Sequence, residues 1–312
     1  SSLEYLLREF NKQLDVNFQF PGHVGVEHEL SDSVWLHWNF DPELLIPFVV
    51  LSFLYIRGLT RWEDRTRDHP WWRTTLYFLG WLVLLGAVES PLDFLAERHF
   101  FAHMIQHELL IMVGMPLTLL GAPTTPVSRG LPNLIRRYLV SPTLRSFFFK
   151  LGRALFLSPI IAGVLVNVVI IAWHIPDMYN LVLTSNVIHR IQHLSFLIVA
   201  WLFWWNIIDP KPLHARMALP MRAIFIFLTG MPKHLVGAFL VFSSTFFYTG
   251  YLEFAPVFTS MSRTDDQTLG GLIMWVGALS IHLAAMGLTI FIWVHRQQIA
   301  QERHLLELQG ND

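Results

Sequence analysis

Two short histidine pairs have the clearest capacity for chemistry in this sequence. One segment reads HMIQH and places His103 and His107 four residues apart, and a second reads HRIQH and places His189 and His193 at the same spacing. Residues four apart lie on one face of a helix, so each pair can offer two imidazoles to one ion. Neutral imidazole is a strong ligand for copper, zinc and iron. The sequence therefore predicts a metal site between two helices that run in parallel.

Three further histidines are weaker candidates for the same site. His99 extends the first pair by one helical turn, but three rings in that arrangement span about 12 Å, too far for a single ion. His174 lies at the end of the apolar segment 156–174, which precedes the second pair. His234 is expected at the same depth in the membrane as His107. The candidate metal ligands are therefore His103, His107, His189, His193, His174, His99 and His234.

Each histidine also has an ordinary structural interpretation. Imidazoles in membrane helices form interhelical hydrogen bonds, and Gln106 and Gln192 are candidates either for that role or for orienting a ligand. Cysteine is absent, which excludes disulfides and thiolate metal sites. Copper on imidazole is the preferred cofactor, and a haem held by one ring from each helix is the alternative. A retinal protein is excluded because the last apolar segment lacks a lysine.

The Met-Pro-Lys-His segment at 231–234 contains a second group of unusual residues. Pro232 is expected to break its helix near His234 and to free backbone groups. Lys233 is the one lysine within a predicted span. A buried ammonium needs a partner or a water-filled cavity, so we expect Lys233 to pair with Glu108 or to repel cations from one side of a path.

The elements that position these residues are membrane helices. The chain is 53% hydrophobic and 14% charged, against about 25% charged in soluble domains, which excludes a soluble globular protein. Its 22 basic and 23 acidic residues nearly cancel, so no overall field favours a nucleic-acid partner. Apolar runs of bilayer length predict an all-α integral membrane protein with seven transmembrane helices. These are expected at 43–59, 74–91, 98–120, 156–174, 187–208, 219–242 and 268–294.

The lysines and arginines between these spans indicate the orientation. Sixteen of the 22 fall on the side that includes the C-terminus, five fall on the other side, and Lys233 lies within the sixth span. Basic residues are retained in cytoplasmic loops. We therefore expect the N-terminus outside, the C-terminus in the cytoplasm and the paired histidines in the outer half of the membrane.

This layout predicts three regions and one peripheral helix. The regions are an extracytoplasmic N-terminal tail at 1–42, a seven-helix membrane domain at 43–295 and a cytoplasmic helical tail at 296–312. The basic and apolar pattern of 131–155 is typical of an interfacial amphipathic helix, interrupted at Pro142.

The N-terminal tail carries additional residues that can bind metal. These are His23, His28, His37, Glu27 and Glu29. They are candidates for collecting metal outside the membrane, although a solvated or docking segment is the simpler interpretation.

Four sequence blocks in fixed order are specific enough to indicate a family. They are HMIQHELLIMVGMPLTLLGAP at 103–123, WHIPDMYNLVL at 173–183, HRIQHLSFLIVAWLFWW at 189–205 and DQTLGGLIMW at 266–275. The chain resembles the CtaG family of membrane proteins linked to assembly of caa3-type cytochrome c oxidase. The resemblance implies a seven-helix protein that supplies or inserts copper during oxidase maturation. By motif position it carries over His103, His107, His174, His189 and His193, with Asp266 and Trp275 marking the last motif.

The expected function is that of a copper-handling factor in the bacterial cytoplasmic (inner) membrane, with an outward-facing histidine site. No catalytic residue is assigned and no enzymatic turnover is expected. The expected partners are the lipid bilayer and subunits of cytochrome c oxidase or another respiratory complex. The alternative, from another class, is a permanent structural or cofactor-binding subunit of a respiratory complex that holds haem or copper.

Overall fold

The computed structural model describes residues 34–63, 68–139, 158–210 and 217–309, and every regular element among them is helical. Each of the seven predicted spans corresponds to helix in its described part. The long helices are α2 (Pro42–Thr60), α4 (Trp71–Glu89), α6 (Phe100–Glu108) continued by η2 (Leu109–Gly114) and α7 (Met115–Leu120), α11 (Pro159–His174), α13 (Asn186–Ile208), α14 (Leu219–Phe242), and α15 (Arg263–Leu272) continued by η4 (Ile273–Gly277) and α16 (Ala278–Gln309). Shorter helices connect them, namely η1 (Val34–Leu36), α5 (Pro91–Ala96), α8 (Thr124–Gly130), α9 (Asn133–Leu139), α12 (Pro176–Thr184) and η3 (Thr249–Glu253).

Four of these helices are long and apolar enough to cross a membrane. They are Phe100–Leu120, Asn186–Ile208, Leu219–Phe242 and Arg263–Gln309. The pair α11 and α12, bent by 73°, provides a fifth candidate span. Large apolar side chains such as Phe239 and Phe242 are exposed on these helices, as expected for surfaces that face lipid. The described residues therefore show four or five candidate spans, and seven spans remain a prediction.

The helix that carries His103 and His107 changes its pitch halfway along. The segment η2 is π-helical, and the Met115 amide donates to the carbonyl of Leu110, five residues earlier. Pro116 follows directly and has no N–H to donate. The wider turn accommodates this missing bond, so the helix continues through the proline.

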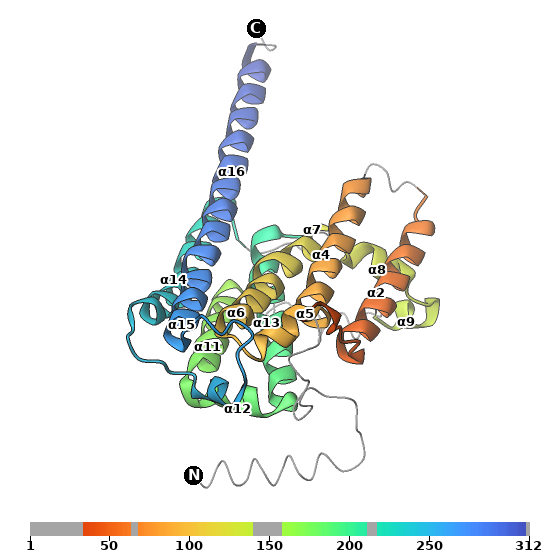
Figure 1. The fold of residues 1–312 in the computed structure, drawn as a ribbon. Coiled ribbons are helices and arrows are strands. Elements are labelled where there is room, and N and C mark those ends of the chain that lie inside the picture. Colours follow the sequence, from red (N-terminus) through yellow and green to blue (C-terminus); the bar gives the residue numbers. More distant parts are fainter. Residues whose placement is uncertain (1–33, 64–67, 140–157, 211–216, 310–312) are drawn as a thin grey trace.

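The helices pack around this interrupted helix. α4 contacts η2 and α7, α13 contacts them from another direction, and α15 contacts α6. α14 packs on α15, α16 and α11, while α2 packs mainly on α8 at one edge of the bundle (Figure 1). At that edge, Gly58 lies against the backbone of Pro126 and Gly130 against that of Leu54, so neither position has space for a Cβ.

The prediction that Pro232 breaks its helix is wrong, because α14 runs without interruption from Leu219 to Phe242. Proline is tolerated in a packed membrane helix where neighbouring groups satisfy the backbone groups that it frees. The segment 131–155 is described only as far as Leu139, where α9 ends. The rest of that segment, and His23 and His28, lie outside the described residues.

The C-terminal helix extends well beyond the bundle. α16 continues to Gln309 as a regular helix and projects away from the other helices (Figure 1). Residues 300–309 are all exposed. The polar tail is thus helical, as the sequence predicts.

Candidate metal centre

Four histidine rings from α6 and α13 come together inside the bundle. The ring centroids of His103 and His107 are 4.3 Å apart, and those of His189 and His193 are also 4.3 Å apart. Between the helices, His103 lies 5.2 Å from His189, and His107 lies 5.5 Å from His193. The rings occupy the corners of a closed quadrilateral, which we term the four-histidine cluster.

Four ring nitrogens of this cluster have no hydrogen-bond partner among the described residues. Nε2 of His103, both ring nitrogens of His107 and Nε2 of His193 are buried and unpartnered. An unpaired buried polar atom costs about 1–3 kcal/mol of stability. Several such atoms in one place are therefore more typical of a ligand site than of a packed core.

The spacing of the nitrogens suits an ion after a small adjustment. One nitrogen each from His103, His107 and His193 lies within 4.8 Å of the others. Imidazole binds metals at about 2.0–2.1 Å, so two nitrogens on a tetrahedral ion lie about 3.3 Å apart. Modest rotation of the rings would bring the nitrogens to that separation, and the residues present fit a histidine-bound metal.

Tyr251 fixes the proton on His103. The Tyr251 hydroxyl lies 3.2 Å from the Ala96 carbonyl, which can only accept, and 3.1 Å from Nδ1 of His103. Because the hydroxyl donates its one proton to the carbonyl, it accepts a hydrogen bond from Nδ1–H of His103. This arrangement leaves the lone pair of His103 on Nε2, the nitrogen that faces the cluster, as outer hydrogen bonds commonly do for metal-binding histidines. Tyr179 supports the hydroxyl at 2.9 Å.

His174 has the same kind of arrangement. Its Nδ1 lies 2.7 Å from the Ile170 carbonyl and must donate to it, while Nε2 is buried without a partner. The ring interacts electrostatically with both His103 and His107. His174 is therefore placed at the border of the four-histidine cluster.

His99 lies outside the helix that carries His103 and His107, and its ring nitrogens form hydrogen bonds within the protein. The helix begins at Phe100, and His99 precedes it with an extended φ of −135°. The prediction that three histidines share one helical face is therefore wrong for His99. The amides of Val257 and Phe258 donate to its Nε2 at 3.0 and 3.2 Å, and its Nδ1 lies 3.3 Å from the Asp266 carboxylate. Both nitrogens of His99 thus have protein partners.

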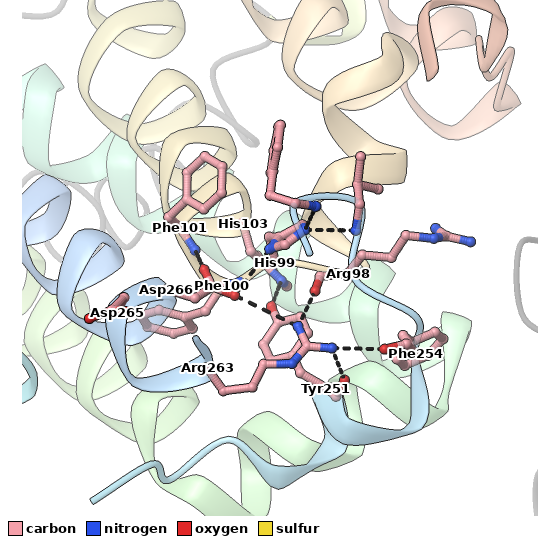
Figure 2. A network of polar contacts seen from close by, with 12 residues as sticks. Arg98, His99, Phe100, Phe101, His103, Tyr251, Phe254, Arg263, Asp265 and Asp266 are labelled. Atoms are coloured by element: carbon pink, nitrogen blue, oxygen red, sulfur yellow. Dashed lines mark hydrogen bonds and ion pairs between the residues drawn. The ribbon is translucent and has the colours of Figure 1, made fainter. Parts of the chain in front are cut away.

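Asp266 explains why α6 starts where it does. Its carboxylate accepts hydrogen bonds from the amides of Phe100 and Phe101 at 3.1 and 2.8 Å (Figure 2). These are free N–H groups of the first helical turn, which favours a negative charge. The guanidinium of Arg263 binds the carbonyls of Arg98, Tyr251 and Phe254 at 2.7–2.8 Å and ties this turn to η3 (Figure 2). Together they hold His103 opposite Tyr251.

Two further buried groups lie on α14. The prediction that Lys233 pairs with Glu108 is confirmed, because its Nζ lies 2.5 Å from Oε1 of Glu108. His234 contacts His282 of α16 at 3.0 Å, between Nε2 and Nδ1. His234 is therefore paired with His282, which is not among the candidate metal ligands predicted from the sequence.

Sequence reasoning missed the supporting tyrosines and the position of Asp266 at the start of α6. Tyr179 lies in one of the motif blocks, whereas Tyr251 lies in the aromatic connection before the last motif. The glutamines beside the rings are both fully buried. Gln106 donates to the Ala87 carbonyl and to Asp93 at 2.9 and 2.7 Å, while Gln192 lies close to His103.

Comparison with known proteins identifies the chain's family. Residues 53–296 match the profile of the cytochrome c oxidase caa3 assembly factor family (Caa3_CtaG). The chain belongs to this family, since the match covers well over half of its length.

Curated relatives come from mycobacteria. Uncharacterized proteins of Mycobacterium bovis and Mycobacterium tuberculosis are each 29% identical to 76% of this chain, and an uncharacterized protein of Mycobacterium leprae is 23% identical to 86% of it. The matched regions cover only 36%, 36% and 41% of those proteins. The chain therefore spans well under half the length of these curated relatives. No solved structure matches it.

Proposed function

We propose that the four-histidine cluster binds a copper ion and that the protein delivers this ion to a cytochrome c oxidase subunit during assembly of the oxidase. The convergence of unpartnered buried nitrogens from His103, His107 and His193 supports this proposal most directly. His189 completes the cluster, and Tyr251 orients His103. Membership of the oxidase assembly factor family supplies the process in which the ion would be used.

The choice of copper rests on ligand chemistry. Imidazole accepts several transition metals, but affinities for a given site increase towards copper. The chain has no cysteine, so no thiolate competes with the imidazoles. A metal destined for another protein must also be released, and a site of neutral side chains without carboxylate ligands holds its ion less tightly than a charged one.

The proposed location follows from the charge distribution. We infer seven transmembrane helices in a bacterial cytoplasmic membrane, with the N-terminus outside and α16 ending in the cytoplasm. In this orientation α6 and α13 both start at the outer surface. His103 and His193 would then lie about 4.5 and 10.5 Å below it, within reach of an extracytoplasmic partner.

The first experiment is elemental analysis and an optical spectrum of the same purified sample. The protein is extracted in mild detergent, loaded with Cu(I) without oxygen, and desalted. We expect roughly one copper per chain, as for a single ligand cluster, and no Soret band. A haem spectrum would overturn the copper assignment, and absence of any bound metal in the folded protein would overturn the metal site altogether.

A second experiment tests delivery. The loaded protein is mixed with an isolated copper-free oxidase subunit that carries a copper site, and copper is measured in both after separation. Transfer to the subunit, with no lasting complex, is the expected result. A stable stoichiometric complex without transfer would indicate a permanent subunit of a respiratory complex.

A further inference from the structure

A cavity of about 480 Å³ opens beside the four-histidine cluster, and its wall combines four acidic side chains with apolar ones such as Val88 and Leu110. Asp41, Glu89, Asp93 and Glu97 line it, with Arg190 as the one basic residue among its lining residues. Glu89 and Asp93 are more than nine-tenths buried. Acidic residues that line a low-dielectric cleft raise the local concentration of cations.

The cavity leads to the histidines. His189 and His193 are part of its wall. A second, smaller space of about 20 Å³ is lined by Glu97, Asn186 and His189, which also line the large cavity, and by His103. This volume is enough for a single water molecule, and hence for one bare metal ion. Its wall includes His103, which is 1% exposed and whose Nε2 has no partner among the described residues.

The carboxylates nearest the histidines are held in place by partners within the protein. Glu97 pairs with Arg98 at 3.1 Å, and Asp93 accepts hydrogen bonds from the side-chain amides of Asn39 and Gln106 at 2.8 and 2.7 Å. Burial, together with the nearby charges of Asp41 and Glu89, raises the pKa of Asp93 to about 7. These contacts fix the positions of both side chains in the wall of the cavity.

We propose that this acidic cavity is the route by which a metal cation reaches the four-histidine cluster, and that Glu97 passes the ion from the cavity to His189 and His103. The inference rests on the proposed function, because it assigns a path to the metal site proposed above. Glu97 lines both spaces, and its side chain is only 16% exposed. It is a positioning residue rather than a permanent ligand.

The Lys233–Glu108 pair does not share this acidic character. The two charges neutralise each other, and the ammonium acts electrostatically on His174. The four carboxylates that line the cavity outnumber Arg190 and Arg98, so a cation is expected to approach from the cavity side.

The test is the rate of loading. Wild type, Glu97→Gln and the control Glu302→Gln, whose side chain is exposed on the far end of α16, are mixed anaerobically with Cu(I) supplied as its acetonitrile complex. Samples are stopped at set times with a colorimetric Cu(I) chelator, and copper bound to the protein is measured after desalting. We expect Glu97→Gln to load about tenfold more slowly but to reach the wild-type copper content, while Glu302→Gln loads normally.

A second variant tests the same route independently, in case Glu97→Gln does not fold. Asn186→Lys places a positive charge where the two spaces meet, and we expect it to slow loading at least as much as Glu97→Gln. If both variants load at the wild-type rate, the route is wrong while the metal site stands. If wild type binds no copper, the proposed function fails and the route fails with it.

Discussion

The four-histidine cluster and the His234–His282 pair are both buried sets of imidazoles between neighbouring helices, yet they differ in how their nitrogens are used. In the cluster, nitrogens of His103, His107 and His193 converge without partners. In the pair, Nε2 of His234 and Nδ1 of His282 are hydrogen-bonded to each other at 3.0 Å, and only the outer nitrogen of each ring lacks a partner among the described residues. His234 also follows Lys233 directly in the chain, and the ammonium acts electrostatically on both rings.

This difference shows that two buried sets of histidines are not equivalent as candidate metal sites. A histidine that satisfies another histidine stabilises the contact between two helices, as polar side chains do in membranes. The charged side chains beside the two sets also differ: an acidic cavity borders the cluster and favours a cation there, whereas the charge beside the pair is Lys233, which is paired with Glu108. A better criterion for a candidate metal site is a set of unpartnered histidine nitrogens that converge next to acidic side chains.

Loss of metal is the largest expected effect and tests the comparison directly. His103→Ala/His193→Ala removes one ligand from each helix, and we expect its copper content to fall from roughly one ion per chain to nearly none. The matched control is His234→Ala/His282→Ala, which should retain wild-type copper. Elemental analysis after desalting measures both. Loss of copper in the control alone would reverse the assignment of the two regions.

Breaking the ion pair on α14 is expected to have the next largest effect. Lys233→Met leaves the Glu108 carboxylate buried without its partner, which costs about 3–5 kcal/mol. Thermal unfolding in detergent should show a large decrease in melting temperature. Lys233→Met/Glu108→Leu should recover much of it, because no charge is then left unpaired. Equal stability of Lys233→Met and wild type would show that the pair is not structural.

Removing the Tyr251 hydroxyl tests whether this group orients His103 within the cluster. Tyr251→Phe eliminates the group that orients His103, and we expect copper affinity to fall about 10–100-fold, with the copper content at saturation unchanged. Competition with a chromophoric chelator gives the affinity. Tyr55→Phe is the matched control, since Tyr55 is a buried tyrosine whose hydroxyl lies 2.8 Å from a different histidine, His69. An affinity unchanged in Tyr251→Phe would remove this role.

The smallest expected effect concerns pH. The pKa of Asp93 is raised from 3.8 to about 7, mainly by burial. The protonated carboxyl is therefore favoured by folding, so its stabilising contribution is complete below about pH 4 and is lost as pH rises to about 7. Metal-free wild type should melt at a lower temperature at pH 8 than at pH 5. Asp93→Asn should show a smaller difference, and a difference as large as that of wild type would assign it to other groups.

The sequence predicted the helices and the histidine pairs because both follow from local periodicity. Apolar runs gave the positions of the helices, and the spacing of four placed His103 with His107. It could not predict what depends on contacts between distant segments. The start of α6 is set by Asp266, more than 160 residues away, so His99 lies outside the helix. Tyr251 reaches His103 only because η3 folds under α6.

The last helix extends from the neighbourhood of the four-histidine cluster to the far end of the molecule. From Arg263 to Gln309 it forms one 47-residue helix, about 70 Å long at 1.5 Å per residue. One end holds the first amides of α6 through Asp266, and the other end stands free of the bundle (Figure 1). Asp266, which holds the start of α6, and the exposed end near Gln309 therefore belong to one continuous helix. The segment that fixes where α6 begins is thus also the segment that extends farthest from the bundle (Figure 1).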